Sequence, residues 1–156
     1  MTKIGLSDAD RKGSVKVLSA LLADEYVLYT KTRNYHWNVT GPHFNDLHKF
    51  FEVQFAELIL IVDDVAERIR SLGDLTPASL GEFVKATRLQ EHPGDFPDAA
   101  GMIVNLVADH ESLIRHLRTD LAACADKFHD MGTSDFLTGL MEQHEKMAWM
   151  LRSIGA

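Results

Sequence analysis

Apolar residues recur every three or four positions over four long stretches of the chain, which is the spacing of helices with a buried face. These stretches run from about residue 8 to 38, from 43 to 72 and from 98 to 127, and the last runs from a restart at 132–135 to about 153. No stretch reads as a convincing strand. The pattern therefore predicts an all-α protein of four long helices.

The breaks between these stretches predict how the helices are connected. Gly41 and Pro42 interrupt the first two stretches with a short turn, because a residue before proline disfavours helix. Residues 75–97 form a long irregular connection with three prolines, in which 79–87 has a short helical pattern. Four helices with one long crossover between the second and third are typical of a ferritin-like bundle. We expect one domain over residues 1–156.

The second helix has apolar residues around much of its circumference. A helix of this kind is usually buried on more than one side, so we expect it to face its own bundle and also a partner subunit. The residues concerned are Phe44, Leu47, Phe51, Phe55, Leu58, Ile59, Ile61, Val62, Val65 and Ile69.

Five residues of metal-ligand type stand out in the first two helices, and four of them share one side of the second. At about 100° per residue, Glu52, Asp63 and Glu67 lie about 40°, 60° and 100° around the axis from His48. His36 lies near the end of the first helix, so the short turn brings it close to His48 and Glu52.

The two pairs on the second helix are too far apart for one metal ion. His48 and Glu52 precede Asp63 and Glu67 by 15 residues, or about 22 Å of helix. Two copies packed antiparallel about a two-fold axis would bring each pair to the other pair of its partner. The axis would pass near residues 57 and 58.

Apolar residues around Leu58 and Ile61 are expected to stabilise this two-fold contact by burying area. Two imidazoles with carboxylates suit a divalent transition metal such as iron, and the absence of clustered cysteine argues against a thiolate zinc site. The alternative is that these are ordinary charged helix residues, either exposed or in ion pairs.

The same residues resemble the signature of the DNA-protecting miniature ferritins, the Dps family. The resemblance rests on Tyr-His-Trp-Asn at 35–38 before Gly-Pro, on the spacing His-x11-His-x3-Glu, and on Asp-x3-Glu-Arg-Ile-Arg at 63–70. It implies a hollow homo-dodecamer that oxidises ferrous iron, commonly with hydrogen peroxide rather than oxygen, and keeps the ferric mineral inside. It implies an iron site of His36, His48 and Glu52 from one subunit with Asp63 and Glu67 from its partner, although many members have Asp in place of Glu52.

The resemblance also suggests roles for four further residues. Trp37 is similar to a family tryptophan beside the iron site that intercepts an oxidising radical, or it packs at a helix end. Asp126, Asp130 and Asp135 lie where acidic residues of the family line an iron-entry pore at a three-fold axis, although aspartate is also common in turns and first helical turns.

Composition and charge limit the cellular locations and the partners that we expect. The net charge is −7, which gives no general attraction for nucleic acid. Few basic residues lie near either end, so we expect DNA binding to be weak or absent at neutral pH and moderate salt. Cys124 is the single cysteine, and the sequence has neither an apolar signal segment nor an apolar run of membrane length. These features favour a cytoplasmic location. We expect association with the nucleoid only if DNA is bound.

Three other functions compete with that of an iron-oxidising storage and detoxification protein. An ordinary ferritin uses Glu-x-x-His pairs, and no Glu here is followed three residues later by His. A DNA-compacting structural protein with a secondary metal site is the main alternative, and a bundle that only mediates protein contacts is another. Four further histidines, at 110, 116, 129 and 144, show no shared location in the sequence pattern.

Overall fold

Between residues 2 and 155, five helices follow one another, and their order confirms the all-α ferritin-like prediction. The computed structural model describes residues 2–155, within which there is no strand. The elements are α1 (Asp8–Asn38), α2 (Phe44–Ser71), the short α3 (Leu80–Ala86), α4 (Ala99–Asp126) and α5 (Met131–Ile154). Each of the first four begins and ends within about one residue of the expected bounds.

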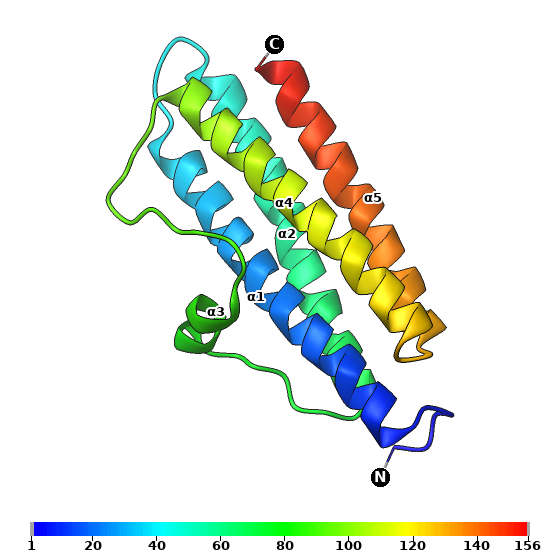
Figure 1. Cartoon of the computed structure of the whole chain (residues 1–156). Coiled ribbons are helices and arrows are strands. Elements are labelled where there is room, and N and C mark those ends of the chain that lie inside the picture. Colours follow the sequence, from blue (N-terminus) through cyan, green and yellow to red (C-terminus); the bar gives the residue numbers. More distant parts are fainter. Residues whose placement is uncertain (1, 156) are drawn as a thin grey trace.

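The four long helices form two antiparallel hairpins, α1 with α2 and α4 with α5 (Figure 1). The connection from α2 to α4 runs back along the whole bundle and passes over α1, with α3 lying in it (Figure 1). The core is filled by apolar side chains from all four long helices, among them Leu18, Leu28, Phe51, Leu106 and Leu140. Burial of these side chains is the main stabilising contribution to such a bundle.

Polar side chains cap the N-termini of three helices. Ser7 caps α1 by accepting a hydrogen bond from the backbone N–H of Asp10, and Asp98 caps α4 by accepting one from Gly101. Ser79 and Glu82 form a reciprocal capping box at the start of α3. These caps satisfy backbone donors that would otherwise be left open at the first turn.

The last helix begins earlier than the sequence pattern predicted. The Asp130 carboxylate accepts a hydrogen bond from the Thr133 backbone N–H at 2.9 Å, which starts α5 at Met131. Gly132 and Asp135 therefore lie inside the helix rather than in a restart before it. The expectation was wrong because glycine was read as a break, although a strong N-cap tolerates it in a first turn.

The crossover is held to the bundle by a buried carboxylate. Asp24 of α1 accepts hydrogen bonds from the hydroxyl of Thr87 and from the backbone and side chain of Arg88. The Arg88 guanidinium also contacts Asp120 of α4 at 2.8 Å. One arginine thus ties the connection to two long helices.

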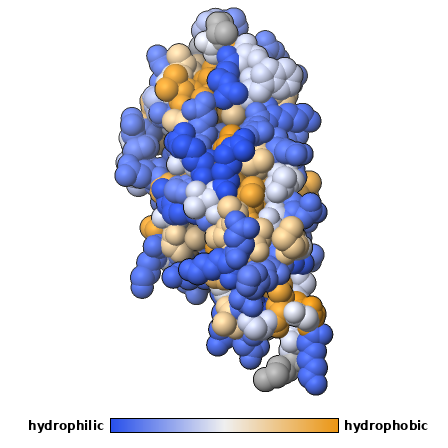
Figure 2. All heavy atoms as spheres, turned by 45° about the vertical axis from the view of Figure 1, so that its right-hand side comes forward, coloured by the Kyte–Doolittle hydropathy of each residue, from blue (hydrophilic) through white to orange (hydrophobic). Residues whose placement is uncertain are grey.

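Several large apolar side chains remain exposed on this single chain. Figure 2 shows apolar side chains interspersed among hydrophilic ones on the side of the molecule that it displays. Those exposed on α4 and α5 include Val104, Met131, Trp149 and Ile154. Between residues 2 and 155 no helix is both long and apolar enough to cross a membrane.

Candidate metal centre

His36 and His48 lie face to face where α1 ends and α2 begins. Gly41, with a φ of +113°, permits the tight reversal between the two helices. The two imidazole rings are stacked with centroids 3.8 Å apart and planes 18° from parallel. His36 is only 8% exposed, and His48 is half-buried. The structure thus brings these two predicted ligands together within one chain.

The backbone fixes the protonation pattern of both rings. His36 Nδ1 lies 2.7 Å from the carbonyl oxygen of His48, and His48 Nδ1 lies 2.8 Å from the carbonyl oxygen of His36. A carbonyl oxygen only accepts, so each Nδ1 carries the proton and donates it. In the neutral rings, each Nε2 therefore keeps its lone pair, which is the form that binds a metal ion.

Two phenylalanine rings hold this pair from either side. Phe44 stacks on His48 with ring centroids 5.1 Å apart, and the edge of Phe55 meets His36 at the same centroid distance. Aromatic contacts of this kind restrict the orientation of each plane. The pair is therefore held in place by contacts with its neighbours.

Glu52, Asp63 and Glu67 are exposed on the side of α2 that faces away from its own bundle. The buried face of that helix is formed by Leu47, Phe51, Gln54, Leu58, Ile61, Val65 and Ile69. Within residues 2–155, no group of three or more His, Cys, Asp or Glu side chains is placed to hold a metal ion. Within one chain, therefore, the histidine pair and the three carboxylates do not come together at one metal position.

The apolar residues on this ligand-bearing side differ from those expected. Leu58 and Ile61 themselves are buried in the chain's own core and are not available for a two-fold contact, whereas the expectation that apolar residues around them stabilise such a contact stays a prediction. Ile59 and Ala56 lie within the same sector as the carboxylates at about 100° per residue, and they are exposed. The error arose because both sides of α2 carry apolar residues, and periodicity alone does not say which one faces the bundle.

Trp37 projects from the end of α1 next to His36. Its side chain is 61% exposed, so it does not pack inside this chain. The Arg33 guanidinium carbon lies 4.7 Å from the centroid of its indole, a cation–π arrangement. The predicted packing role within the subunit is therefore not observed.

The three aspartates near the α4–α5 turn have different environments. Asp126 and Asp135 are exposed, whereas Asp130 is 4% exposed and bonded to Thr133 and Arg68. These hydrogen bonds lower the pKa of the Asp130 carboxyl against the opposing effect of burial. Asp130 therefore has a structural role as the cap of α5, and a pore role is retained as a proposal for Asp126 and Asp135 only.

A buried polar chain crosses the centre of the bundle and was missed by sequence reasoning. His144 of α5 contacts the Glu25 carboxylate of α1 at 2.8 Å through Nε2, and its Nδ1 lies 3.0 Å from Nδ1 of His110 on α4. All three side chains are fully buried. The helical periodicity places each of these three residues on a core-facing side of its helix. It does not give the register between α4 and α5, which determines that the two histidines meet.

Comparisons with known proteins agree with this fold. Residues 15–155 match the family model of the ferritin-like domain. DNA protection during starvation protein 2 of Bacillus anthracis is 36% identical to this chain over 91% of the chain and 96% of its own length. The chain belongs to the Dps family of ferritin-like proteins.

Two further similarities cover almost the whole chain. A low temperature-induced protein of Nostoc sp., described as uncharacterized, is 50% identical over 96% of this chain and 84% of its own length. The crystal structure of a Dps protein from Vibrio cholerae has a TM-score of 0.90 and 33% identity, covering 98% of this chain and 95% of that one. That protein is described as a member of a broad superfamily of ferritin-like diiron-carboxylate proteins.

Proposed function

We propose that this Dps-family protein oxidises ferrous iron and stores the ferric product, and thereby limits oxidative damage. The observation that carries the proposal is the stacked histidine pair, because its reciprocal backbone bonds leave Nε2 unprotonated in each of two adjacent neutral rings. Such a pair beside carboxylates is a donor set suited to iron. The diiron-carboxylate description of the Vibrio cholerae relative supports the same class of chemistry.

The complete site is proposed to form between two subunits. His36, His48 and Glu52 would come from one subunit, and Asp63 and Glu67 from its two-fold partner. The support is geometric, since 15 residues of helix, or about 22 Å, separate the two ligand pairs on α2. The exposed Ile59 and Ala56 lie between the pairs and are available for the contact.

Each group has a distinct task in this proposal. The imidazole Nε2 atoms bind the incoming ferrous ion, and the carboxylates neutralise its charge. Carboxylate oxygen is a hard ligand, so it also accommodates the harder ferric product. Hydrogen peroxide is the proposed oxidant, and twelve subunits are proposed to enclose the mineral, with Asp126 and Asp135 at the entry pore.

The charge of the chain supports iron handling more than DNA compaction. A net charge of −7 per subunit attracts cations and repels phosphate. We therefore propose no role in DNA compaction.

Replacing both histidines tests the proposal. The variant His36→Ala/His48→Ala loses both nitrogen ligands, so ferrous oxidation followed by stopped-flow absorbance should slow markedly with peroxide and with oxygen. The matched control is His92→Ala/His116→Ala, which removes two histidines outside the site and should oxidise iron at the wild-type rate. Size-exclusion chromatography verifies that both variants assemble as the wild type does. Equal oxidation rates in an intact His36→Ala/His48→Ala shell would refute the assignment.

A further inference from the structure

His48 is the middle ring of a stack of three. Its imidazole is stacked on His36 at a centroid distance of 3.8 Å and on Phe44 at 5.1 Å. No ring contact joins Phe44 to His36 within the described residues, so these two rings lie on opposite faces of His48. Phe55 meets His36 at an interplanar angle of 78°, so Phe44 is the phenyl ring that is stacked on an imidazole of the pair.

Phe44 is the first residue of α2 and lies one helical turn before His48, on the same side of the helix. This helix start has no side-chain cap, because the N-cap residue His43 makes no capping hydrogen bond. The Phe44 side chain is 45% exposed, so it contributes little to the core. Between residues 2 and 155, its one ring contact is the stack on His48.

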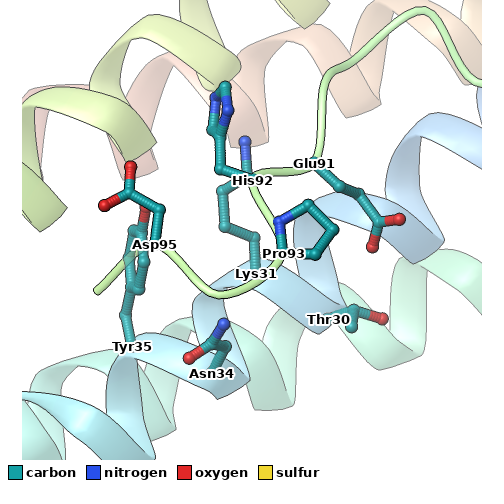
Figure 3. A pocket seen from close by; sticks show the side chains of 8 residues that line it. All are labelled: Thr30, Lys31, Asn34, Tyr35, Glu91, His92, Pro93 and Asp95. Carbon is teal, nitrogen blue, oxygen red and sulfur yellow. The ribbon is translucent and has the colours of Figure 1, made fainter. Parts of the chain in front are cut away.

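The other aromatic side chains beside the pair do not share this position. Tyr35 directly precedes His36, yet its side chain lines a pocket between α1 and the crossover, beside Asp95 (Figure 3). Trp37 is 61% exposed and has no ring contact with either histidine in the part of the chain that the structure describes. The stack on the imidazole is therefore particular to Phe44.

Metal binding would change the charge of the middle ring. When Nε2 gives its lone pair to a divalent cation, electron density leaves the imidazole and the ring becomes more positive. The face of a phenyl ring carries the negative part of its quadrupole, so a stacked phenyl stabilises a positive neighbour. On the other face of His48, the imidazole of His36 offers no such compensation.

We propose that Phe44 is a positioning residue of the iron site, which orients the His48 ring and stabilises it once Nε2 carries an ion. The inference rests on the proposed function, because it requires His48 to be a ligand. Phe44 acts through His48 and does not touch the ion. The stabilisation applies to the bound ferrous ion and to the transition state of its oxidation alike. Loss of the phenyl ring should therefore raise KM for ferrous iron and leave kcat unchanged.

The test is the binding of cobalt(II) chloride to the assembled protein without an oxidant, followed by d–d absorbance. His48→Ala identifies the part of this absorbance that belongs to the site. Phe44→Leu removes the ring but keeps an apolar side chain, and it should weaken cobalt binding about two- to fivefold. Phe44→Tyr keeps the ring and should restore the wild-type affinity. Phe50→Leu is the matched control and should leave the affinity unchanged, because the Phe50 ring contacts that of Phe51 and neither histidine.

A fluorinated ring separates the proposed role from a purely structural one. Pentafluorophenylalanine at position 44 keeps the shape of the ring but reverses its quadrupole. A ring that served for packing alone would leave cobalt affinity as it is in the wild type. We expect this variant to bind cobalt at least as weakly as Phe44→Leu, with a parallel rise in KM for ferrous iron and an unchanged kcat.

The two readouts distinguish failure of this inference from failure of the proposed function. Protein that binds cobalt through His48 but leaves ferrous iron unoxidised contradicts the proposed function and not the role of Phe44. Normal iron oxidation without cobalt binding through His48 overturns the role of Phe44. Cobalt affinity unchanged by Phe44→Leu or by the fluorinated ring overturns it as well. An equal loss in Phe50→Leu would do the same, because it would point to general loosening of α2.

Discussion

At the scale of single residues, the protonation state of the histidine pair decides what the site can bind. A ring that donates through Nδ1 to a carbonyl presents Nε2 to a metal ion, whereas the opposite tautomer presents a proton there. The two Nδ1 contacts, at 2.7 and 2.8 Å, select the first state in both rings.

We therefore expect the metal-free protein to contain both rings as the Nδ1–H tautomer. Nitrogen-15 NMR of the imidazoles above their titration range measures this, with protonated-type shifts expected for Nδ1 and unprotonated-type shifts for Nε2. The exposed His92 serves as the control and should show averaged shifts, because the described structure gives its imidazole ring no hydrogen bond. An Nε2–H tautomer at either His36 or His48 would contradict the geometry.

The residue types of the site were predictable from sequence, but their states were not. The spacing of His36, His48 and Glu52 around a short turn was enough to predict that they lie at one end of a hairpin. The tautomer depends on carbonyl positions that no residue pattern records. Asp130 shows the same limit, since an acidic residue near a turn is equally consistent with a pore and with the buried cap that the structure contains.

At the scale of the elements, helix bounds followed from periodicity, whereas contacts between distant elements did not. Asp24 and Arg88 are 64 positions apart and lie in a helix and in the irregular crossover. Their pairing depends on the path of the crossover over α1, for which the sequence holds no local pattern. Because this contact fixes the crossover, its loss should lower the stability of the whole fold.

Asp24→Ala should destabilise the fold by about 2–3 kcal/mol. Removing one partner of a buried pair typically costs about 3–5 kcal/mol, and the cost is smaller here because Arg88 keeps Asp120 and some solvent contact. Urea unfolding followed by circular dichroism measures the change. The control Lys85→Ala alters an exposed charge on α3 and should change stability by less than about 0.5 kcal/mol. Equal stability of the two variants would show that the crossover is held by other contacts.

The buried Glu25–His144–His110 chain joins three helices and should make the bundle sensitive to acid. Burial lowers the pKa of His110 well below 6.5, and the neighbouring His144 charge adds to this. In the unfolded chain, His110 regains an ordinary pKa near 6.5 and takes up a proton that the folded state excludes. Stability is therefore unaffected by this group above that pH and falls as the pH drops below it.

Replacing His110 should remove that part of the pH dependence. Each pH unit below about 6.5 should favour unfolding of the wild type by up to tenfold in the unfolding equilibrium constant through this one group. His110→Leu should show a shallower decline of unfolding free energy between pH 6.5 and 5, whatever its absolute stability. The exposed His92→Leu is the control and should keep the wild-type slope. An unchanged slope in His110→Leu would show that the buried imidazole already binds its proton in the folded state.

At the scale of the whole molecule, the proposed site extends beyond the subunit. Helix geometry predicts this from the sequence, and the carboxylates face outward from α2, as a shared site requires. Which apolar residues accompany them was not predictable, since Leu58 and Ile59 are adjacent and only the packed bundle shows that the first is buried. The partner's position remains a proposal that mixing experiments can test.

Complementation between two inactive variants is the decisive measurement. His48→Ala damages the histidine half of the proposed site, and Asp63→Ala/Glu67→Ala damages the carboxylate half, so each variant alone should oxidise ferrous iron slowly. In a mixed dimer one site collects both kinds of damage, whereas the other receives intact histidines from one subunit and intact carboxylates from the other. The two-fold arrangement therefore predicts that verified heterodimers regain one active site of the two. Unmixed samples of each variant, taken through the same dissociation and reassembly, control for recovery caused by refolding. Heterodimers that remain as inactive as the parents would mean that the five ligands do not combine across this interface.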